Sequence, residues 1–346
     1  MQPESNALLT DINTLAVHST AKWFIRAQLL DDFHQAFNFA SEQKLPIRVL
    51  GAGSNVVLES MVNAVVVQPV NDAISIIKET SESVVVEVGA GMEWHKLVMW
   101  AVEKNWYGFE NLALIPGSVG ASPIQNIGAY GVELASVVDS INFLLISSAT
   151  SHSLTVEQCE FAYRDSIFKH TLRDRAVITS VRFILSKTPK PVLSYPALLQ
   201  ALTATGKDLE NPSSLKALDI ANTVIGIRQS KLPDPKVIPN AGSFFKNPVV
   251  TLKKFERLLE EFPNIVGYAH GASHYKLAAG WLIDHMGLKG ELSNGVGLHL
   301  DQALVLVNPG QRSGATILKY AQTICKRVFD YYRVELEIEP RVYLVA

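Results

Sequence analysis

Short runs of β-branched residues recur through the first half of the chain and predict strands. These runs lie at residues 47–51, 64–69, 83–91, 137–147 and 176–185. Between them, residues 31–43 and 93–105 carry apolar side chains three and four positions apart, the spacing that places them on one face of a helix. The first half is therefore predicted to be a mixed α+β structure.

The second half of the chain has longer helical patterns. The pattern predicts helices at 252–262, 276–287 and 314–332, and strands at 303–308 and 334–345. The stretch from Lys187 to Pro212, which precedes this half, is polar and contains several prolines, as is typical of a connection between domains. We expect the part that follows it to be a sheet covered by helices.

The composition is that of an ordinary globular chain with no general attraction for polyanions. The 346 residues are 48% apolar, which is enough for two or three domains with sizeable cores. Lysine and arginine together number 31 against 33 acidic residues, so no global positive field exists to hold nucleic acid. Any phosphate recognition must therefore be local.

Cys159 and Cys325 are far apart in the sequence and form neither a disulfide framework nor a metal-ligand spacing. We therefore expect no metal site and a cytoplasmic location. The amino-terminal residues lack the basic and apolar regions of a secretory signal, and no apolar run approaches the roughly 18 residues of a membrane span. We expect no membrane insertion.

Two glycine-containing loops carry the first chemical signal. In the first loop, a predicted strand runs into Gly51, Gly53, Ser54 and Asn55, where small residues let backbone N–H groups approach an anion. It is not a Rossmann fingerprint, because the third glycine is missing and a β-rich run follows where that motif needs a helix. A plain tight turn is the alternative.

The second loop, residues 110–131, is richer in glycine and small polar residues. It contains Gly117, Gly120, Gly128, Gly131, Ser118, Ser122 and Asn126. The loop is too apolar to be a solvated linker, so its backbone polar groups need partners. The pyrophosphate of a bound dinucleotide could accept hydrogen bonds from them. The alternative is a glycine-rich corner satisfied by its own turns.

Six blocks of sequence, in order and at consistent spacing, resemble the UDP-N-acetylenolpyruvoylglucosamine reductase family. They are LGAGSN (50–55), ENLALIPGSVGASPIQNIGAYG (110–131), YRDSIFK (163–169), RQSKLPDPKVIPNAGSFFKNP (228–248), KLAAGWLID (276–284) and HLDQALVLVN (299–308). The resemblance covers nearly the whole chain. It implies NADPH-dependent, FAD-mediated reduction of UDP-N-acetylglucosamine enolpyruvate to UDP-N-acetylmuramate, a step of peptidoglycan synthesis that serves cell-wall biogenesis, cell shape and cell division.

The resemblance also implies the fold, which is α+β. It combines a two-part FAD-binding domain of the PCMH/vanillyl-alcohol-oxidase-like type with a separate α+β substrate-binding domain. The expected boundaries are 1–190 for the FAD-binding domain (subdomains at about 1–68 and 69–190), 191–227 for a connection, 228–332 for the substrate-binding domain, and 333–346 for a carboxy-terminal strand returning to the active site. FAD is expected to be non-covalent.

Reduction of an enolpyruvyl ether needs a cation and an acid. Hydride delivered to the terminal alkene carbon leaves negative charge delocalised into the carboxylate, and the neighbouring carbon must then be protonated. Arg164 offers a planar cation that can hold the carboxylate and stabilise this charge, and by resemblance it is the catalytic arginine. Its alternative is a salt bridge with Asp165 or Asp174.

Two further catalytic residues follow from the resemblance. Ser243 is the proton donor, a task open to a hydroxyl that a hydrogen-bonded lysine or water can recharge; its alternative is a turn. Glu335, Glu337 and Glu339 alternate with apolar residues and so share one strand face. The register makes Glu339 the catalytic glutamate and leaves the other two in solvent, although Pro340 stands where the family usually has valine.

The remaining site residues are those that the resemblance implies. The cofactor-binding residues are Gly51, Gly53, Ser54, Asn55, Gly117, Ser118, Gly120, Ser122, Asn126, Gly128 and Ala129. The substrate-binding residues are Tyr163, Tyr195, Lys231, Asn247, Tyr268 and Gln302. Tyr268 lies in a longer loop of the kind that closes a tyrosine over the diphosphate.

The expected partners are UDP-N-acetylglucosamine enolpyruvate and NADPH, and we expect a monomer with ping-pong kinetics. Two other functions stay open: a flavin oxidase of the same binding fold, and a non-catalytic flavin or nucleotide sensor. A covalent flavin would favour the oxidase, yet neither glycine loop contains histidine or cysteine. The retained Arg164, Ser243 and terminal glutamate argue against the sensor, because a binding module has no use for a proton donor beside a carboxylate clamp.

Overall fold

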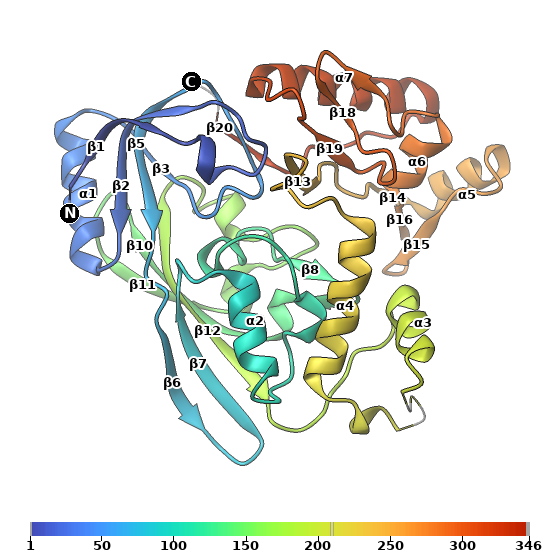
Figure 1. The fold of residues 1–346 in the computed structure, drawn as a ribbon, viewed down its shortest axis with the longest axis horizontal. Coiled ribbons are helices and arrows are strands. Elements are labelled where there is room, and N and C mark those ends of the chain that lie inside the picture. Colours follow the sequence, from blue (N-terminus) through green and yellow to red (C-terminus); the bar gives the residue numbers. More distant parts are fainter. Residues whose placement is uncertain (1, 208, 210, 344–346) are drawn as a thin grey trace. The chain divides into compact units, whose positions relative to one another are not determined.

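The computed structural model describes residues 2–207, 209 and 211–343. Figure 1 shows its helices and strands. Among these residues, no helix has both the length and the apolar character needed to cross a membrane. The chain groups into two compact units. Unit 1 comprises Met1–Ala7, Ala21–Ala52 and Asn63–Ser230, and unit 2 comprises Leu8–Thr20, Gly53–Val62 and Lys231–Ala346.

Unit 1 begins with a four-stranded sheet covered by one helix. The strand order is β1 (Glu4–Leu8), β2 (Thr20–Ala27), β5 (Met61–Pro69) and β3 (Ile47–Val49). Helix α1 (Leu30–Glu42) buries Phe33 and Phe37 in the same core as Val65 and Val67 of β5. The apolar spacing predicted for residues 31–43 is therefore the face of α1 that packs against this sheet.

A five-stranded antiparallel sheet forms the rest of the unit 1 framework. Its order is β11 (Ser151–Thr155), β10 (Val138–Leu145), β12 (Ala176–Ser186), β7 (Ser83–Gly89) and β6 (Ile74–Glu79). Helix α2 (Trp94–Val102) shares one core with this sheet, and the Trp94 ring lies 6.0 Å from that of Phe183 on β12. The short hairpin β8 (Gly128–Ala129) and β9 (Val132–Glu133) completes the strands of the unit.

The stretch between the predicted domains is helical over much of its length. It contains α3 (Pro196–Ala204) and most of α4 (Ala217–Lys231), seen in Figure 1 in yellow-green and yellow. Leu198 and Leu202 of α3 and Ile220 of α4 are fully buried in the core of the five-stranded sheet. These helices are thus packed into the core of unit 1. The predicted domain boundaries themselves stay a prediction.

Unit 2 contains two small antiparallel sheets and one parallel strand pair. The first sheet has the order β13 (Asn240–Ser243), β19 (Val305–Val307), β18 (Val296–Leu298) and β17 (Leu292–Ser293), and the second has β14 (Val249–Thr251), β16 (His274–Leu277) and β15 (Gly267–His270). Strand β20 (Arg341–Tyr343) pairs in parallel with β4 (Val56–Leu58). Helices α5 (Leu252–Glu261), α6 (Ala279–His285) and α7 (Gly314–Tyr332) accompany them, and α6 and α7 bury Leu282, Ile317 and Ile324 in the unit core.

Two predicted elements of unit 2 are shorter than the pattern indicated. The helix predicted at 276–287 begins only at Ala279, because residues 274–277 pair as strand β16. Of the strand predicted at 334–345, residues 344 and 345 lie outside the described residues; up to residue 343 it is regular only over β20, and Ile338 forms one isolated bridge to Phe245 before it. Pro340 cannot donate a backbone hydrogen bond, which explains the interruption just before β20.

Candidate active site

The second glycine loop is pinned to the start of α2. The indole Nε1 of Trp94 donates to the Leu112 carbonyl at 2.9 Å, and the Trp94 N–H donates to the Gly117 carbonyl at 3.0 Å. Two backbone N–H groups of the loop donate in return: Val119 donates to the Met92 carbonyl and Gly120 to the Ala90 carbonyl. These bonds satisfy much of the loop's backbone within the protein, as a buried loop requires.

Glycine is required in this loop by a close neighbour and by the backbone conformation. A Cβ on Gly120 would lie 2.6 Å from the Cβ of Ala90, and Gly117 has a φ of +133° that side chains rarely allow. The first glycine loop meets the second here. A Cβ on Gly51 would lie 2.6 Å from the Ser118 hydroxyl oxygen, so the structure brings together these two predicted cofactor residues.

Three hydrogen-bond donors at this meeting point have no partner in the described part of the chain. They are the backbone N–H groups of Gly117 and Ser118 and the Ser118 hydroxyl. Ser118 is 8% exposed and Gly117 is partly buried, so these donors are available to a ligand that accepts hydrogen bonds. Converging small-residue N–H groups are the donor set that binds a diphosphate, and these residues therefore fit the diphosphate of FAD.

Other predicted cofactor residues bond within the protein. The Ser122 hydroxyl donates to the Val119 carbonyl at 2.7 Å. The Asn126 amide donates to Glu133 at 2.9 Å and to the Ala162 carbonyl at 3.1 Å, and its oxygen accepts from the Ala135 N–H at 3.0 Å. Asn126 thus ties the loop to the turn that carries Arg164.

Gly53, Ser54 and Asn55 belong to unit 2 and have a structural setting of their own. The Gly53 carbonyl accepts from the Thr14 N–H at 3.1 Å, and a Cβ on Gly53 would lie 1.9 Å from the Ile12 carbonyl oxygen. With a φ of +64°, Gly53 cannot be replaced without strain. The Asn55 carbonyl accepts from the Arg341 N–H at 2.9 Å, which continues the pairing of β4 with β20.

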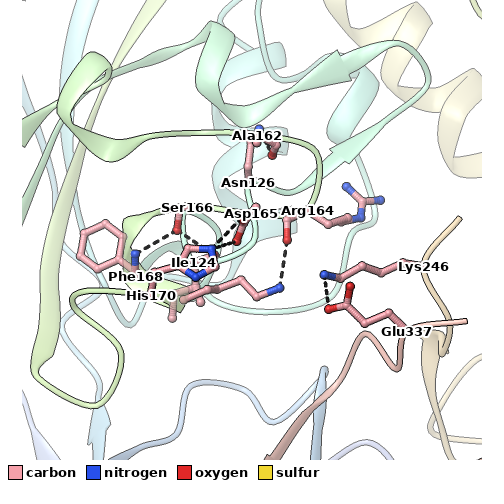
Figure 2. Close-up of polar contacts among 11 residues, drawn as sticks. Ile124, Asn126, Ala162, Arg164, Asp165, Ser166, Phe168, His170, Lys246 and Glu337 are labelled. Atoms are coloured by element: carbon pink, nitrogen blue, oxygen red, sulfur yellow. Dashed lines mark hydrogen bonds and ion pairs between the residues drawn. The ribbon is translucent and has the colours of Figure 1, made fainter. Parts of the chain in front are cut away.

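Arg164 occupies a tight turn that side chains fix from several directions (Figure 2). Its φ is +55°, an uncommon left-handed conformation for a residue with a side chain. Its Nη2 donates to the Gly128 carbonyl at 2.9 Å, and its own carbonyl accepts from Lys169 Nζ at 3.0 Å. The buried Ser166 hydroxyl donates to the Ile124 carbonyl at 2.7 Å, so the turn is also bonded to the glycine loop.

The two carboxylates considered as salt-bridge partners of Arg164 have other cations beside them. Asp165 lies 2.7 Å from Nε2 of His170, a contact drawn in Figure 2, and Asp174 lies 3.4 Å from Nη1 of Arg48. The guanidinium of Arg164 also lies 5.6 Å from the ring centre of Tyr163. Asp165 therefore has a cation other than Arg164 beside it.

Ser243 ends strand β13 in unit 2, and its side chain is exposed. Gly242 before it has a φ of +68°, and nothing lies within 4 Å of the place that a Cβ would occupy. Glycine is therefore favoured here by its backbone conformation and not by a lack of room for a side chain. The two residues after it, Phe244 and Phe245, are fully buried and fix the strand end in the unit core. The serine is thus presented from a rigid support, as a proton donor requires.

The carboxy-terminal segment runs antiparallel beside Ser243 and its neighbours. The Glu339 N–H donates to the Phe244 carbonyl, and the Lys246 N–H donates to the Glu337 carbonyl, both at 2.9 Å. This register sets Glu339 next to the residue that follows Ser243, while Glu337 forms an ion pair with Lys246 (Figure 2). Glu335 and Glu337 are exposed. The geometry therefore favours Glu339 among the three glutamates.

The predicted substrate residues are spread over both units. Tyr163 and Tyr195 lie in unit 1, where the Tyr195 ring packs edge-on against Tyr130 at 5.2 Å. Lys231, Asn247, Tyr268 and Gln302 lie in unit 2. The Asn247 oxygen accepts from the Ala279 N–H at 2.9 Å and so caps α6. Tyr268, on β15, is 57% exposed and therefore accessible to a ligand.

Arg228, the first residue of the block at 228–248, is a second guanidinium of unit 1 to which no role was assigned from the sequence. Burial is the main cause that lowers the pKa of the Arg228 guanidinium. Tyr130 raises this pKa, and the charge of Arg164 lowers it. No carboxylate within the described ranges forms an ion pair with it. In the sequence it resembles an ordinary cation near a helix end, so only the fold reveals its proximity to Arg164. No cluster of His, Cys, Asp or Glu among the described residues could hold a metal ion.

The fold and the donor set define this chain as an FAD-binding α+β protein, and residues 21–154 match the family described as an FAD binding domain. Residues 234–343 match the C-terminal domain of UDP-N-acetylenolpyruvoylglucosamine reductase. The chain is 44% identical over 334 residues to the reductase of that name from Shewanella sp. (strain ANA-3), covering 96% of this chain and 95% of that protein. It is 40% identical over 340 residues to the one from Pseudomonas fluorescens, covering 98% of each. The chain belongs to the UDP-N-acetylenolpyruvoylglucosamine reductase family.

Solved structures agree on the fold. A UDP-N-acetylenolpyruvylglucosamine reductase from Thermus caldophilus matches with a TM-score of 0.68 and 24% identity, covering 99% of this chain and 100% of that one. A VAO-type flavoprotein from Myceliophthora thermophila matches with a TM-score of 0.50 and 12% identity over 95% of this chain and 74% of that chain. The predicted fold class is therefore confirmed.

Proposed function

We propose that this chain carries out its family's reaction with Arg164, Ser243 and Glu339 as the groups that act on the sugar nucleotide. The reaction is the NADPH-dependent, FAD-mediated reduction of UDP-N-acetylglucosamine enolpyruvate to UDP-N-acetylmuramate in peptidoglycan synthesis. The observation that carries the proposal is the Arg164 turn, whose guanidinium is held by the carbonyl of Gly128 in the loop that also offers Gly117 and Ser118 to a diphosphate.

Non-covalent FAD would be held through its diphosphate by the N–H groups of Gly117 and Ser118 and by the Ser118 hydroxyl. When bound, FAD accepts hydride from NADPH and passes it to the enolpyruvyl alkene, so the two substrates use the site in turn. Gly51 and Gly120 allow Ser118 and Ala90 to approach closely, because a Cβ on either glycine would lie 2.6 Å from an atom of that neighbour. Ser122, Asn126, Gly128 and Ala129 shape the same loop, and Gly53, Ser54 and Asn55 contribute the first loop.

Arg164 holds the substrate carboxylate and stabilises the negative charge that develops on it as hydride arrives at the alkene. Its planar guanidinium can give two parallel hydrogen bonds to a carboxylate. Because Nη2 is oriented by the Gly128 carbonyl and the turn is fixed by Ser166 and Lys169, the cation is positioned before the substrate binds. Such preorganisation removes a reorganisation cost from the chemical step.

Ser243 donates its hydroxyl proton to the carbon next to the carboxylate, and a lysine or water returns a proton to it. Glu339 assists at the same centre. Lys231, Asn247, Tyr268 and Gln302, with Tyr163 and Tyr195, bind the sugar, the carboxylate and the diphosphate, and Tyr268 closes over the diphosphate. The proposal retains the predicted division into FAD-binding residues 1–190, connection 191–227, substrate-binding residues 228–332 and returning strand 333–346.

The proposed setting is a monomer in the cytoplasm. The two widely separated cysteines support the cytoplasmic setting. An experiment that tests the proposed function directly is anaerobic titration of the purified yellow protein with NADPH and then with the enolpyruvyl sugar nucleotide. We expect the flavin to bleach with the first and to recover its colour with the second. Recovery with oxygen but not with the sugar nucleotide would point to a flavin oxidase instead.

A further inference from the structure

Leu114 has an unusual backbone conformation at a position that matters for the cofactor loop. Its φ is +58°, in the left-handed region that leucine rarely adopts. It lies three residues before Gly117, where the donors for the diphosphate begin. A strained residue at such a place persists only when the surrounding structure holds it.

Two side chains from different helices hold the two polar groups of Leu114. Nδ1 of His95, on α2, accepts the Leu114 N–H at 3.1 Å. Nε of Arg228, on α4, donates to the Leu114 carbonyl at 3.3 Å. His95 and Arg228 are far apart in the sequence, and the only residue that both of these bonds share is Leu114.

We infer that His95 and Arg228 form a clamp on Leu114 that positions the N–H groups of Gly117 and Ser118 for FAD, and that protonation of His95 opens this clamp. The inference rests on the proposed cofactor site and names the residues that set its affinity. The bond requires a neutral imidazole with its proton on Nε2, because a protonated ring has two donors and no acceptor for the Leu114 N–H. His95 is thus a positioning residue, not a catalytic one.

The charges around His95 determine the direction of its pH response. Burial lowers its pKa below the ordinary value of 6.5, Glu93 beside it raises the pKa, and Arg228 across from it lowers it. A histidine whose pKa is lowered in the folded loop stabilises that loop above 6.5 and loses this effect as the pH falls below it. FAD affinity should therefore weaken on acidification because of His95.

The test uses the full-length protein with FAD bound, and it measures the FAD dissociation constant from the rise of flavin fluorescence on dilution. His95→Leu removes the acceptor and should weaken FAD binding about 5- to 10-fold near pH 8. His95→Asn keeps an acceptor oxygen near the position of Nδ1 but cannot titrate. It should bind FAD nearly as well as the unaltered protein, without the extra weakening as the pH falls below 6.5.

His152→Asn is the matched control, because this histidine is exposed on β11 of the same unit and contacts Thr150 and Phe143. It should leave both the affinity and its pH dependence unchanged. The variant Leu114→Gly supplies a second measurement, since glycine adopts a positive φ without strain. In that background His95→Leu should cost clearly less than it does alone.

The clamp is overturned if His95→Leu binds FAD as tightly as the unaltered protein. It is also overturned if the FAD affinity of His95→Asn falls on acidification as much as that of the unaltered protein. Should His95→Leu fail to fold, the pH profile of His95→Asn decides the question alone. Failure of the unaltered protein to bind FAD at any pH would contradict the proposed function and the clamp together. Tight, pH-independent binding by every variant would overturn the clamp and leave the proposed function standing.

Discussion

The two units hold their proposed catalytic residues in different ways. In unit 1, Arg164 is fixed mostly by side chains that bond to backbone, with Lys169 on its own carbonyl and Ser166 tying the turn to the glycine loop. In unit 2, Ser243 and Glu339 lie on adjacent stretches that backbone hydrogen bonds join, and buried Phe244 and Phe245 support them. The first arrangement depends on individual side chains, and the second depends mainly on main-chain pairing.

This difference has a consequence for mutagenesis. Replacing Ser243 or Glu339 removes a functional group without removing the bonds that shape the strand, because those bonds are made by the backbone. Replacing Arg164 removes both the proposed cation and its bond to Gly128. Variants in unit 2 should therefore report the chemistry more cleanly than variants in unit 1.

The largest effect is expected for Ser243→Ala. The substitution removes one oxygen from an exposed side chain, so fold, FAD content and flavin reduction by NADPH should be unchanged. Loss of a general acid should lower sugar-nucleotide turnover by about 10²- to 10⁴-fold. Steady-state turnover per bound FAD measures this. Normal turnover with reduced FAD retention would instead indicate that the serine serves only the turn.

Arg164→Lys should lower sugar-nucleotide reduction by about 10²- to 10³-fold. One ammonium group cannot reproduce two parallel hydrogen bonds to a carboxylate. Since the turn also loses its Gly128 contact, a modest drop in thermal stability is expected as well, unlike for Ser243→Ala. Rates measured with saturating NADPH and varied sugar nucleotide would show this, and an unchanged rate would return Arg164 to a structural role.

The neighbouring glutamates provide a matched pair. Glu339→Gln should slow sugar-nucleotide reduction by roughly 10- to 100-fold, because a charge next to the reacting centre is lost. Glu337→Gln removes only the exposed half of the ion pair with Lys246 and should change the rate by less than about twofold. The reverse order of effects would mean that the register at Pro340 is shifted and that Glu337 is the functional residue.

Among the residues proposed to act on the substrate, Tyr268→Phe is expected to have the smallest effect. The exposed hydroxyl is proposed to reach the substrate diphosphate, so its loss should weaken sugar-nucleotide binding about 5- to 10-fold. The maximal rate and the FAD content should hardly change. The Michaelis constants for the two substrates, compared in one preparation, separate this outcome from a general loss of structure, which would affect NADPH as well.

The elements with strong periodicity could be predicted from the sequence almost to the residue. The helix expected at 314–332 is α7, and the strand expected at 176–185 is β12 with one residue more. The prediction was wrong where pairing overrides pattern, as at 276–278, where residues of β16 precede α6. Short-range periodicity carries no information about such long-range partners.

The sequence blocks predict candidate site residues, but they do not predict the contacts that hold those residues in place. Gly51 and Ser118 were expected near one cofactor, and the structure places them in contact. The hold of Arg228 and His95 on Leu114 could not be predicted, because it joins α2, the loop and α4 through single hydrogen bonds. No local pattern indicates that a leucine will adopt a positive φ.

The most direct test of the account follows the two half-reactions of Ser243→Ala separately by stopped flow. The account predicts that NADPH bleaches the flavin of the variant as fast as that of the unaltered protein. Recovery of flavin colour on mixing the reduced variant with the enolpyruvyl sugar nucleotide should be slowed by about 10²-fold or more, or should reverse before product forms. An unimpaired second phase would contradict the proton-donor role of Ser243, and equal slowing of both phases would show that the residue supports the structure instead.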